Sequence, residues 1–131
     1  MPYIEENNTY RHIDFSVGVY DEKNEPVRGV AIDMFVCPSE PWNREPHFPT
    51  SYAALHHDQS GPIDAENNGV FFLNSNVDYE LLTDGSSQTI FVGEKFTERE
   101  GDLGWMSGTR YSLRNTGELI NAVKQGEHVA N

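Results

Sequence analysis

Two short apolar runs, each bounded by turn residues, constrain the fold of this chain most. The first is "GVFFLNSNV" at 69–77, and the second runs from Thr89 to Val92, directly after the turn sequence "DGSS" at 84–87. β-Branched and aromatic residues in short runs favour buried strands, and Asp-Gly suits a tight turn. We therefore expect these runs to form the core of a sheet, with Gly93 allowing a close backbone approach and Glu94 leaving toward solvent.

Other segments predict further strands and helices. Apolar residues alternate over 30–36, which favours a strand, whereas "SYAALHHD" at 51–58 fits a strand or a short helix. Early acids and late basic groups predict a short helix over 3–12. A last helix is expected to start near Asn115 or Thr116, with Gly126 as its stop.

The connections between these elements are long. The polar stretch 20–29 predicts an exposed loop or hairpin end, and four prolines at positions 38, 41, 46 and 49 exclude a helix or central strand around them. A chain of 131 residues is sized for one hydrophobic core. We expect residues 1–131 to form a single α+β domain with a mainly antiparallel sheet, long loops and a short helix near each end.

The charge of the chain excludes some partners. Twenty-one Asp and Glu residues against nine Lys and Arg residues give a formal charge of −12, and no base lies between Arg44 and Lys95. Such a surface repels phosphate backbones and anionic lipid, so we expect no nucleic acid partner and no membrane contact. The eight acids of that base-free stretch form either a solvated surface or an attraction for divalent cations.

Cys37 is the only cysteine of the chain. It excludes an intrachain disulfide and a cysteine-built zinc site. The thiol is then either a small buried hydrophobe or has its partner outside this chain.

A calcium loop is half present in "DAENNG" at 64–69. Asp64, Glu66 and Asn68 alternate and are followed by Gly69, as in the opening of an EF-hand loop, with Glu replacing the usual Asp or Asn at the third position. The twelfth position, where a bidentate Glu is needed, is Ser75. The alternative is a polar turn capped by Asp and Asn side chains.

His57 and Asp58, preceded by His56, combine the ligand types that zinc and copper prefer. Neighbouring residues of a strand point to opposite faces, so the alternative is one buried and one exposed histidine. A serine nucleophile lacks its G-x-S-x-G elbow, and no phosphate-binding glycine motif occurs.

Aromatic residues on predicted loops are candidates for a ligand or partner surface. Trp42, Trp105, Arg110 and Tyr111 carry this hypothesis. The alternative is that these rings fill the core, and the three glycines around Trp105 suggest a loop under which its ring is pinned.

Several segments together resemble a known family. They are "MPYIEENNTYRHIDFS", "FVCPSEP", "TSYAALHHD", "NNGVFFLNSNVDYELLTDGSSQTIFVGEK" and "LGWMSGTRYSLRNTG". In this order they are similar to the prepilin-like secreted proteins of unknown function expanded in planctomycete bacteria. The resemblance covers nearly the whole chain.

The resemblance implies a parent with a pilin-type N-terminal helix, exported and displayed at the cell surface, and a β-rich, pilin-like globular head. The apolar helix expected before Met1 and the late motif of His, nine residues and Asp-Gly are missing from this sequence. A cysteine that commonly follows the pilin helix in the family would be the mate of Cys37. The resemblance implies no catalytic residues.

These observations predict a non-enzymatic structural or adhesive module, the pseudopilin-like head of a secreted, surface or filament protein. Its expected partners are other pilin-like subunits, cell-surface components or glycans. The alternative is a small-ligand or carbohydrate-binding module with calcium as an assisting ion. A metal-dependent hydrolase is a third hypothesis. A concave site rimmed by Trp42, Trp105 or Tyr111 would favour the binding module, and flat apolar patches or exposed strand edges the assembly subunit.

Overall fold

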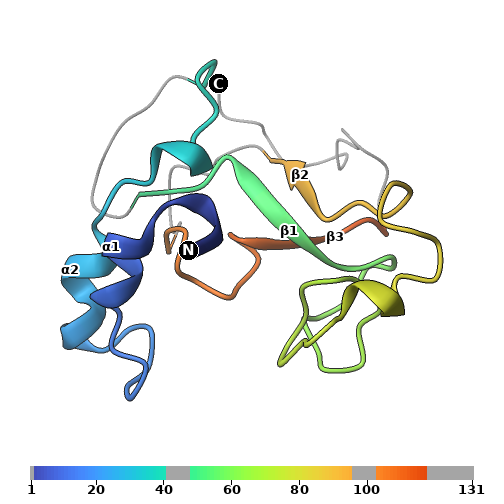
Figure 1. Ribbon diagram of the computed structural model, residues 1–131, viewed down its shortest axis with the longest axis horizontal. Coiled ribbons are helices and arrows are strands. Elements are labelled where there is room, and N and C mark those ends of the chain that lie inside the picture. Colours follow the sequence, from blue (N-terminus) through green and yellow to red (C-terminus); the bar gives the residue numbers. More distant parts are fainter. Residues whose placement is uncertain (1, 41–47, 96–102, 118–131) are drawn as a thin grey trace, which may run out of the picture.

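The computed structural model describes residues 2–40, 48–95 and 103–117, and it is a small α+β fold (Figure 1). Two short α-helices, α1 (Asn7–Arg11) and α2 (Glu25–Arg28), lie at one end of the molecule. The connection from 58 to 91 lies at the opposite end, with the sheet between them. Four 3₁₀ turns accompany these elements, namely η1 (Pro2–Ile4), η2 (Glu22–Asn24), η3 (Asp33–Phe35) and η4 (Tyr79–Leu81).

The sheet has three strands in the order β2-β1-β3. The central strand β1 (Tyr52–His57) pairs antiparallel with β2 (Val92–Glu94) and parallel with β3 (Leu113–Asn115). The pairing with β3 is irregular between Leu55 and His57. The sheet is therefore mixed, and of the two possibilities predicted for 51–58 the strand is confirmed.

The prediction of buried strands over 69–77 and 89–92 is wrong for most of both runs. Only Val92 enters a strand, and Phe71, Leu73, Ile90 and Val92 are 41%, 51%, 62% and 50% exposed. Asn74 has a φ of 59°, which interrupts an extended backbone. The side chains of these runs are thus largely uncovered in the isolated chain.

Of the two glycine roles expected in this region, one is confirmed. Gly85 has a φ of 82°, so the tight turn predicted for Asp84-Gly85 is confirmed. A Cβ on Gly93 would meet nothing within 4 Å, so the expected close approach there is wrong. The close approach occurs at Gly69 instead.

The strand predicted over 30–36 is also wrong, because Asp33–Phe35 form the turn η3. The loop predicted over 20–29 contains η2 and α2. The side chain of Asp21 accepts a hydrogen bond from the backbone N–H of Lys23, and Pro26 occupies the first turn of α2, where a proline costs no hydrogen bond. Capping thus outweighs the polar composition.

The N-terminal helix is confirmed in a shorter form. The expected segment 3–12 divides into η1 and α1, and the break lies at Glu5, whose φ is 62°. The last helix, with its candidate stop Gly126, lies outside the described residues.

Buried polar groups hold this small fold together. Among the described residues, three apolar side chains are buried, namely Val27, Ile32 and Ala53. Six polar residues are buried as well, namely Thr9, Asn24, Thr50, Ser51, His56 and Ser107. Asn24 shows the pattern: its amide donates to the carbonyls of Asp14 and Gly18 and accepts from the N–H of Asp14. Burial of such groups is tolerated because each has partners.

Ser51 joins η3, the 37–40 turn and the sheet. It is fully buried, its hydroxyl donates to Glu40 Oε2 at 2.7 Å, and it accepts from the N–H of Cys37 at 2.8 Å. Its own N–H donates to the carbonyl of Phe35, and its carbonyl accepts from the N–H of Lys95. The start of β1 is therefore fixed by four hydrogen bonds at one residue.

We expect Ser51→Ala to lower the free energy of unfolding by about 2 kcal/mol, because it removes two hydrogen bonds from a buried site. The matched control is Ser39→Ala, at an exposed position of the 37–40 turn to which Ser51 bonds, and it should change stability little. Urea denaturation followed by circular dichroism measures both. Equal stabilities for the two variants would contradict the role given to Ser51.

Candidate functional site

One face of the sheet forms the floor of an open, mainly apolar hollow of about 500 Å³. Ala54 lies at its centre, between Val92 of β2 and Leu113 of β3, its partners in the two ladders. Tyr52 lies two residues away on the same face. The side chain of Ala54 is smaller than those of Val92 and Leu113 on either side of it, so the hollow is deepest over the central strand.

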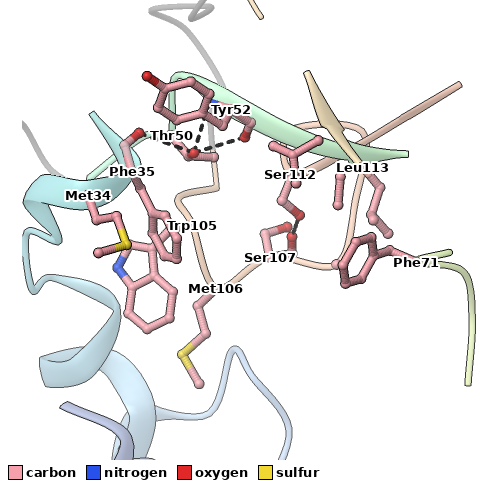
Figure 2. A pocket seen from close by; sticks show the side chains of 13 residues that line it. Met34, Phe35, Thr50, Tyr52, Phe71, Trp105, Met106, Ser107, Ser112 and Leu113 are labelled. Atoms are coloured by element: carbon pink, nitrogen blue, oxygen red, sulfur yellow. Dashed lines mark hydrogen bonds between the residues drawn. The ribbon is translucent and has the colours of Figure 1, made fainter. Parts of the chain in front are cut away.

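The wall of the hollow comes from segments distant in the sequence. They are η3, the loop 105–108, and the ring of Phe71 from the connection between β1 and β2. In Figure 2, Met34, Phe35 and Trp105 lie at one end, whereas Phe71 and Leu113 lie at the other. The hydroxyl-bearing lining residues are Thr50, Tyr52, Ser107 and Ser112, and no lining residue is Lys, Arg, Asp or Glu.

Trp105 is held in place by three contacts. Its indole N–H donates to the carbonyl of Val30 at 2.9 Å, its backbone N–H donates to the carbonyl of Phe48, and its ring centroid lies 6.1 Å from that of Phe35. Gly104, with a φ of 81°, makes the turn that precedes it. The pinned ring predicted from the surrounding glycines is thus found as part of a wall.

The loop after Trp105 is tied to the N-terminal part of the chain. The buried hydroxyl of Ser107 lies 2.9 Å from that of Tyr20 and 2.8 Å from that of Thr109. The hydroxyl of Ser112 donates to the carbonyl of Ser107. The Arg28 guanidinium lies over the Tyr20 ring at 5.6 Å. These contacts fix the position of the wall above the sheet.

Tyr52 is the titratable group that lines the hollow. Its pKa is raised above the usual value, first by burial and then by the negative forms of Cys37 and Glu94 nearby. The phenol therefore stays neutral at physiological pH. Its backbone carbonyl accepts from the hydroxyl of Thr50, which fixes the strand at this point.

The four residues predicted as a ligand surface separate in the structure. Trp105 lines the hollow. Arg110 and Tyr111 do not line it, and instead pair with each other, with the guanidinium 5.3 Å from the ring centroid and an N–H donated to the phenol at 3.4 Å. Trp42 lies outside the described residues. Sequence reasoning missed Phe71, Val92 and Leu113 as lining residues, because it assigned the first two to a buried core.

The residues of the half calcium loop adopt the geometry of a polar turn. Asp64 Oδ1 accepts from the N–H of Ala65 at 2.6 Å, whereas Asn68 Oδ1 accepts from the N–H of Asp58 at 3.1 Å. Glu66 is exposed. Across the three described ranges, no group of three or more His, Cys, Asp or Glu side chains is placed to hold a metal ion.

The two histidines are paired with two consecutive asparagines. His56 is 2% exposed, and its Nδ1 lies 2.8 Å from Asn67 Oδ1, which also accepts from the N–H of Asp64. His57 is half-buried, with its Nδ1 2.5 Å from Asn68 Oδ1 and 3.4 Å from Asp58 Oδ1. The two ring centroids are 6.4 Å apart, and His57 and Asp58 gain no third protein carboxylate, imidazole or thiolate ligand within the described residues.

Gly69 completes this junction, which we call the asparagine clamp (Asn67, Asn68 and Gly69 against His56 and His57). The N–H of Gly69 donates to the carbonyl of His56 at 2.9 Å. A Cβ at Gly69 would lie 2.5 Å from the backbone of both Leu55 and His56, closer than real Cβ contacts. Only glycine fits here, so the motif that resembles a calcium loop serves to attach this loop to β1.

Comparison with known families identifies the chain. Residues 1–124 match the family described as "Protein of unknown function (DUF1559)", whose short name is SBP_bac_10. The chain belongs to this family. No curated protein and no solved structure matches it significantly.

For this DUF1559 chain, two of the quoted sequence segments contain residues that join distant parts of the fold. "FVCPSEP" contains Cys37 and Glu40, which bond to Ser51, and "NNG" is the asparagine clamp. No helix among the described residues is long and apolar enough to span a membrane. The family match thus covers the elements that build the hollow.

We expect Gly69→Ala to destabilise the protein by about 3 kcal/mol, because the added methyl group overlaps the backbone of β1. Gly18→Ala is the matched control, since a Cβ there meets nothing within 4 Å. Thermal and urea unfolding of both variants provide the measurement. A Gly69→Ala protein as stable as the control would show that the clamp does not fix the loop.

Proposed function

We propose that this chain is the non-enzymatic, pseudopilin-like head of a surface or filament protein, with a structural or adhesive role. The observation that supports this is the open hollow over the sheet, surrounded by uncovered apolar side chains. Exposed apolar surface of this kind marks contact sites for other molecules. The head would use it to contact other pilin-like subunits or cell-surface components.

The chemistry of the hollow suits binding. Its lining consists of aromatic, aliphatic, thioether and hydroxyl groups. None of them is a histidine, carboxylate or thiol that could act as an acid, a base or an activated nucleophile at neutral pH. The edge strands β2 and β3 are three residues long, so side chains rather than an extended backbone edge would provide the contact.

The surface location can be tested on intact cells of the source organism. We expect antibodies against this chain to label unpermeabilised cells, and protease added outside to remove the signal. A cytosolic protein that stays intact in the same cells serves as the control. Labelling that requires permeabilisation would contradict a secreted or surface-displayed head.

A second candidate is a small-ligand or carbohydrate-binding module. The volume of about 500 Å³ lies within the range of known ligand sites, and Trp105 with the four hydroxyl residues offers stacking and hydrogen bonds. Calcium belongs to this candidate as an assisting ion, held by Asp64, Glu66 and Asn68. Binding of calcium only to the folded chain would raise its melting temperature.

Tryptophan fluorescence separates the two candidates. The chain has two tryptophans, so Trp105 is the sole reporter in a Trp42→Phe variant. For the second candidate, oligosaccharides or small apolar probes change its emission saturably, and Ala54→Phe, which fills the floor of the hollow, abolishes the change. For the first candidate, which we favour, soluble sugars and calcium leave both the emission and the melting temperature unchanged.

A further inference from the structure

We propose that the hollow is the docking site of a basic, amphipathic polypeptide segment, one that presents apolar side chains flanked by Lys or Arg. This inference rests on the proposed function, because it names the kind of partner that the head would contact. It is carried by two properties of the same face, an apolar floor and an acidic rim.

The floor calls for apolar side chains in the occupant. Val92, Ala54 and Leu113 form a continuous apolar row across the sheet face, and Val92 at the β2 end of this row is half exposed. Met34 and Met106 line the wall, and methionine adapts its shape to varied partner side chains. An apolar segment laid here removes this surface from water.

The rim carries negative charge. Glu94 lies two residues after Val92, so both project from the same face of β2, and Glu94 is the ladder partner of Tyr52. After burial and Cys37, Glu94 is a further cause of the raised pKa of Tyr52, which lines the hollow. In η3, the exposed Asp33 directly precedes the lining residue Met34.

Two of the described arginines are directed to aromatic rings. Arg110 packs on Tyr111, and Arg28 lies over Tyr20. Neither lines the hollow. Asp33 and Glu94 are exposed acids beside the lining residues Met34 and Tyr52, whereas Lys95 and Arg114 are only partly exposed.

The overall charge selects among possible occupants. The formal charge is −12, and residues 45–94, which include all of β1 and β2, contain eight acids and no Lys or Arg. A second copy of this chain would bring the same negative charge, and nucleic acid or anionic lipid would be repelled as well. A basic segment is attracted, and its apolar side chains match the floor.

The direct test uses the purified full chain and a pair of fluorescently labelled synthetic peptides. Both peptides carry the same apolar residues at helical spacing, and their charged positions are all Lys in one and all Glu in the other. Fluorescence anisotropy should show saturable binding of the Lys peptide, weakened by added salt, and no binding of the Glu peptide. Equal binding of both peptides, or of neither, would overturn the proposal.

Matched substitutions locate the site. We expect Val92→Lys to weaken binding of the Lys peptide about tenfold, because it places a positive charge in the apolar floor row. Leu81→Lys makes the same change at an exposed position of η4 outside the hollow and should bind like the wild type. Equal affinities for the two variants would place the site elsewhere and overturn the inference.

The rim is tested separately. Glu94→Gln should weaken binding about threefold and reduce its salt dependence, whereas Glu80→Gln on η4 should do neither. Circular dichroism confirms folding of each variant. If Val92→Lys does not fold, Val92→Ala takes its place, and the comparison of Glu94→Gln with Glu80→Gln tests the site independently. An unchanged affinity and salt dependence in Glu94→Gln would remove the acidic rim from the proposal.

The two proposals fail in different ways. Surface-labelled cells combined with an absence of peptide binding would overturn the docking site and leave the surface head in place. Unlabelled intact cells combined with Val92-dependent binding of the Lys peptide would overturn the surface location and support the docking site.

Discussion

The backbone hydrogen bonds of β1 connect segments from all three described ranges of the chain. Ser51, just before its start, bonds to Phe35 and Lys95, and the N–H of Ala54 donates to the carbonyl of Ser112, just before β3. Farther along, Leu55 bonds to Phe91 and Phe71, and His56 bonds to Gly69. Because few apolar side chains are fully buried, this one strand determines where the other segments lie.

The same constraint explains why the hollow stays open. The segments 69–71 and 91–95 reach β1 through their backbones, and Phe71 and Val92 line the hollow while remaining largely exposed. The floor row of Val92, Ala54 and Leu113 is thus formed by strand pairing and remains accessible. The accessibility of this face therefore follows from the way in which the sheet is assembled.

Sequence reasoning located some local features correctly. The turn at Gly85, the strand over 52–57 and the pinned ring of Trp105 each depend on a few neighbouring residues, whose chemistry is visible in the sequence. It failed for 30–36 and 69–77. Alternating or continuous apolar residues indicate a strand there, but this pattern contains no information on whether a partner strand is available. In the fold, β1 takes its partners from Val92–Glu94 and Leu113–Asn115 instead.

Some features of the candidate site were likewise visible in the sequence, and others only in the structure. The sequence indicated Trp105 as a loop aromatic, but Phe71, Val92 and Leu113 were recognisable as lining residues only once they lay on one face. The half calcium motif at 64–69 showed a polar turn ending in a glycine, and the tertiary structure decided that the glycine serves a close approach to β1.

What the sequence by itself determined is its strongly negative charge, its lone thiol and its turn-forming residues, since these depend on residue type and on immediate neighbours. Only the tertiary structure decided which apolar runs are uncovered and which acids border the hollow. Those properties depend on strand pairing between residues up to about sixty positions apart, such as Ala54 and Leu113. Long-range pairing reflects the relative free energies of alternative partners, and no single segment contains that information.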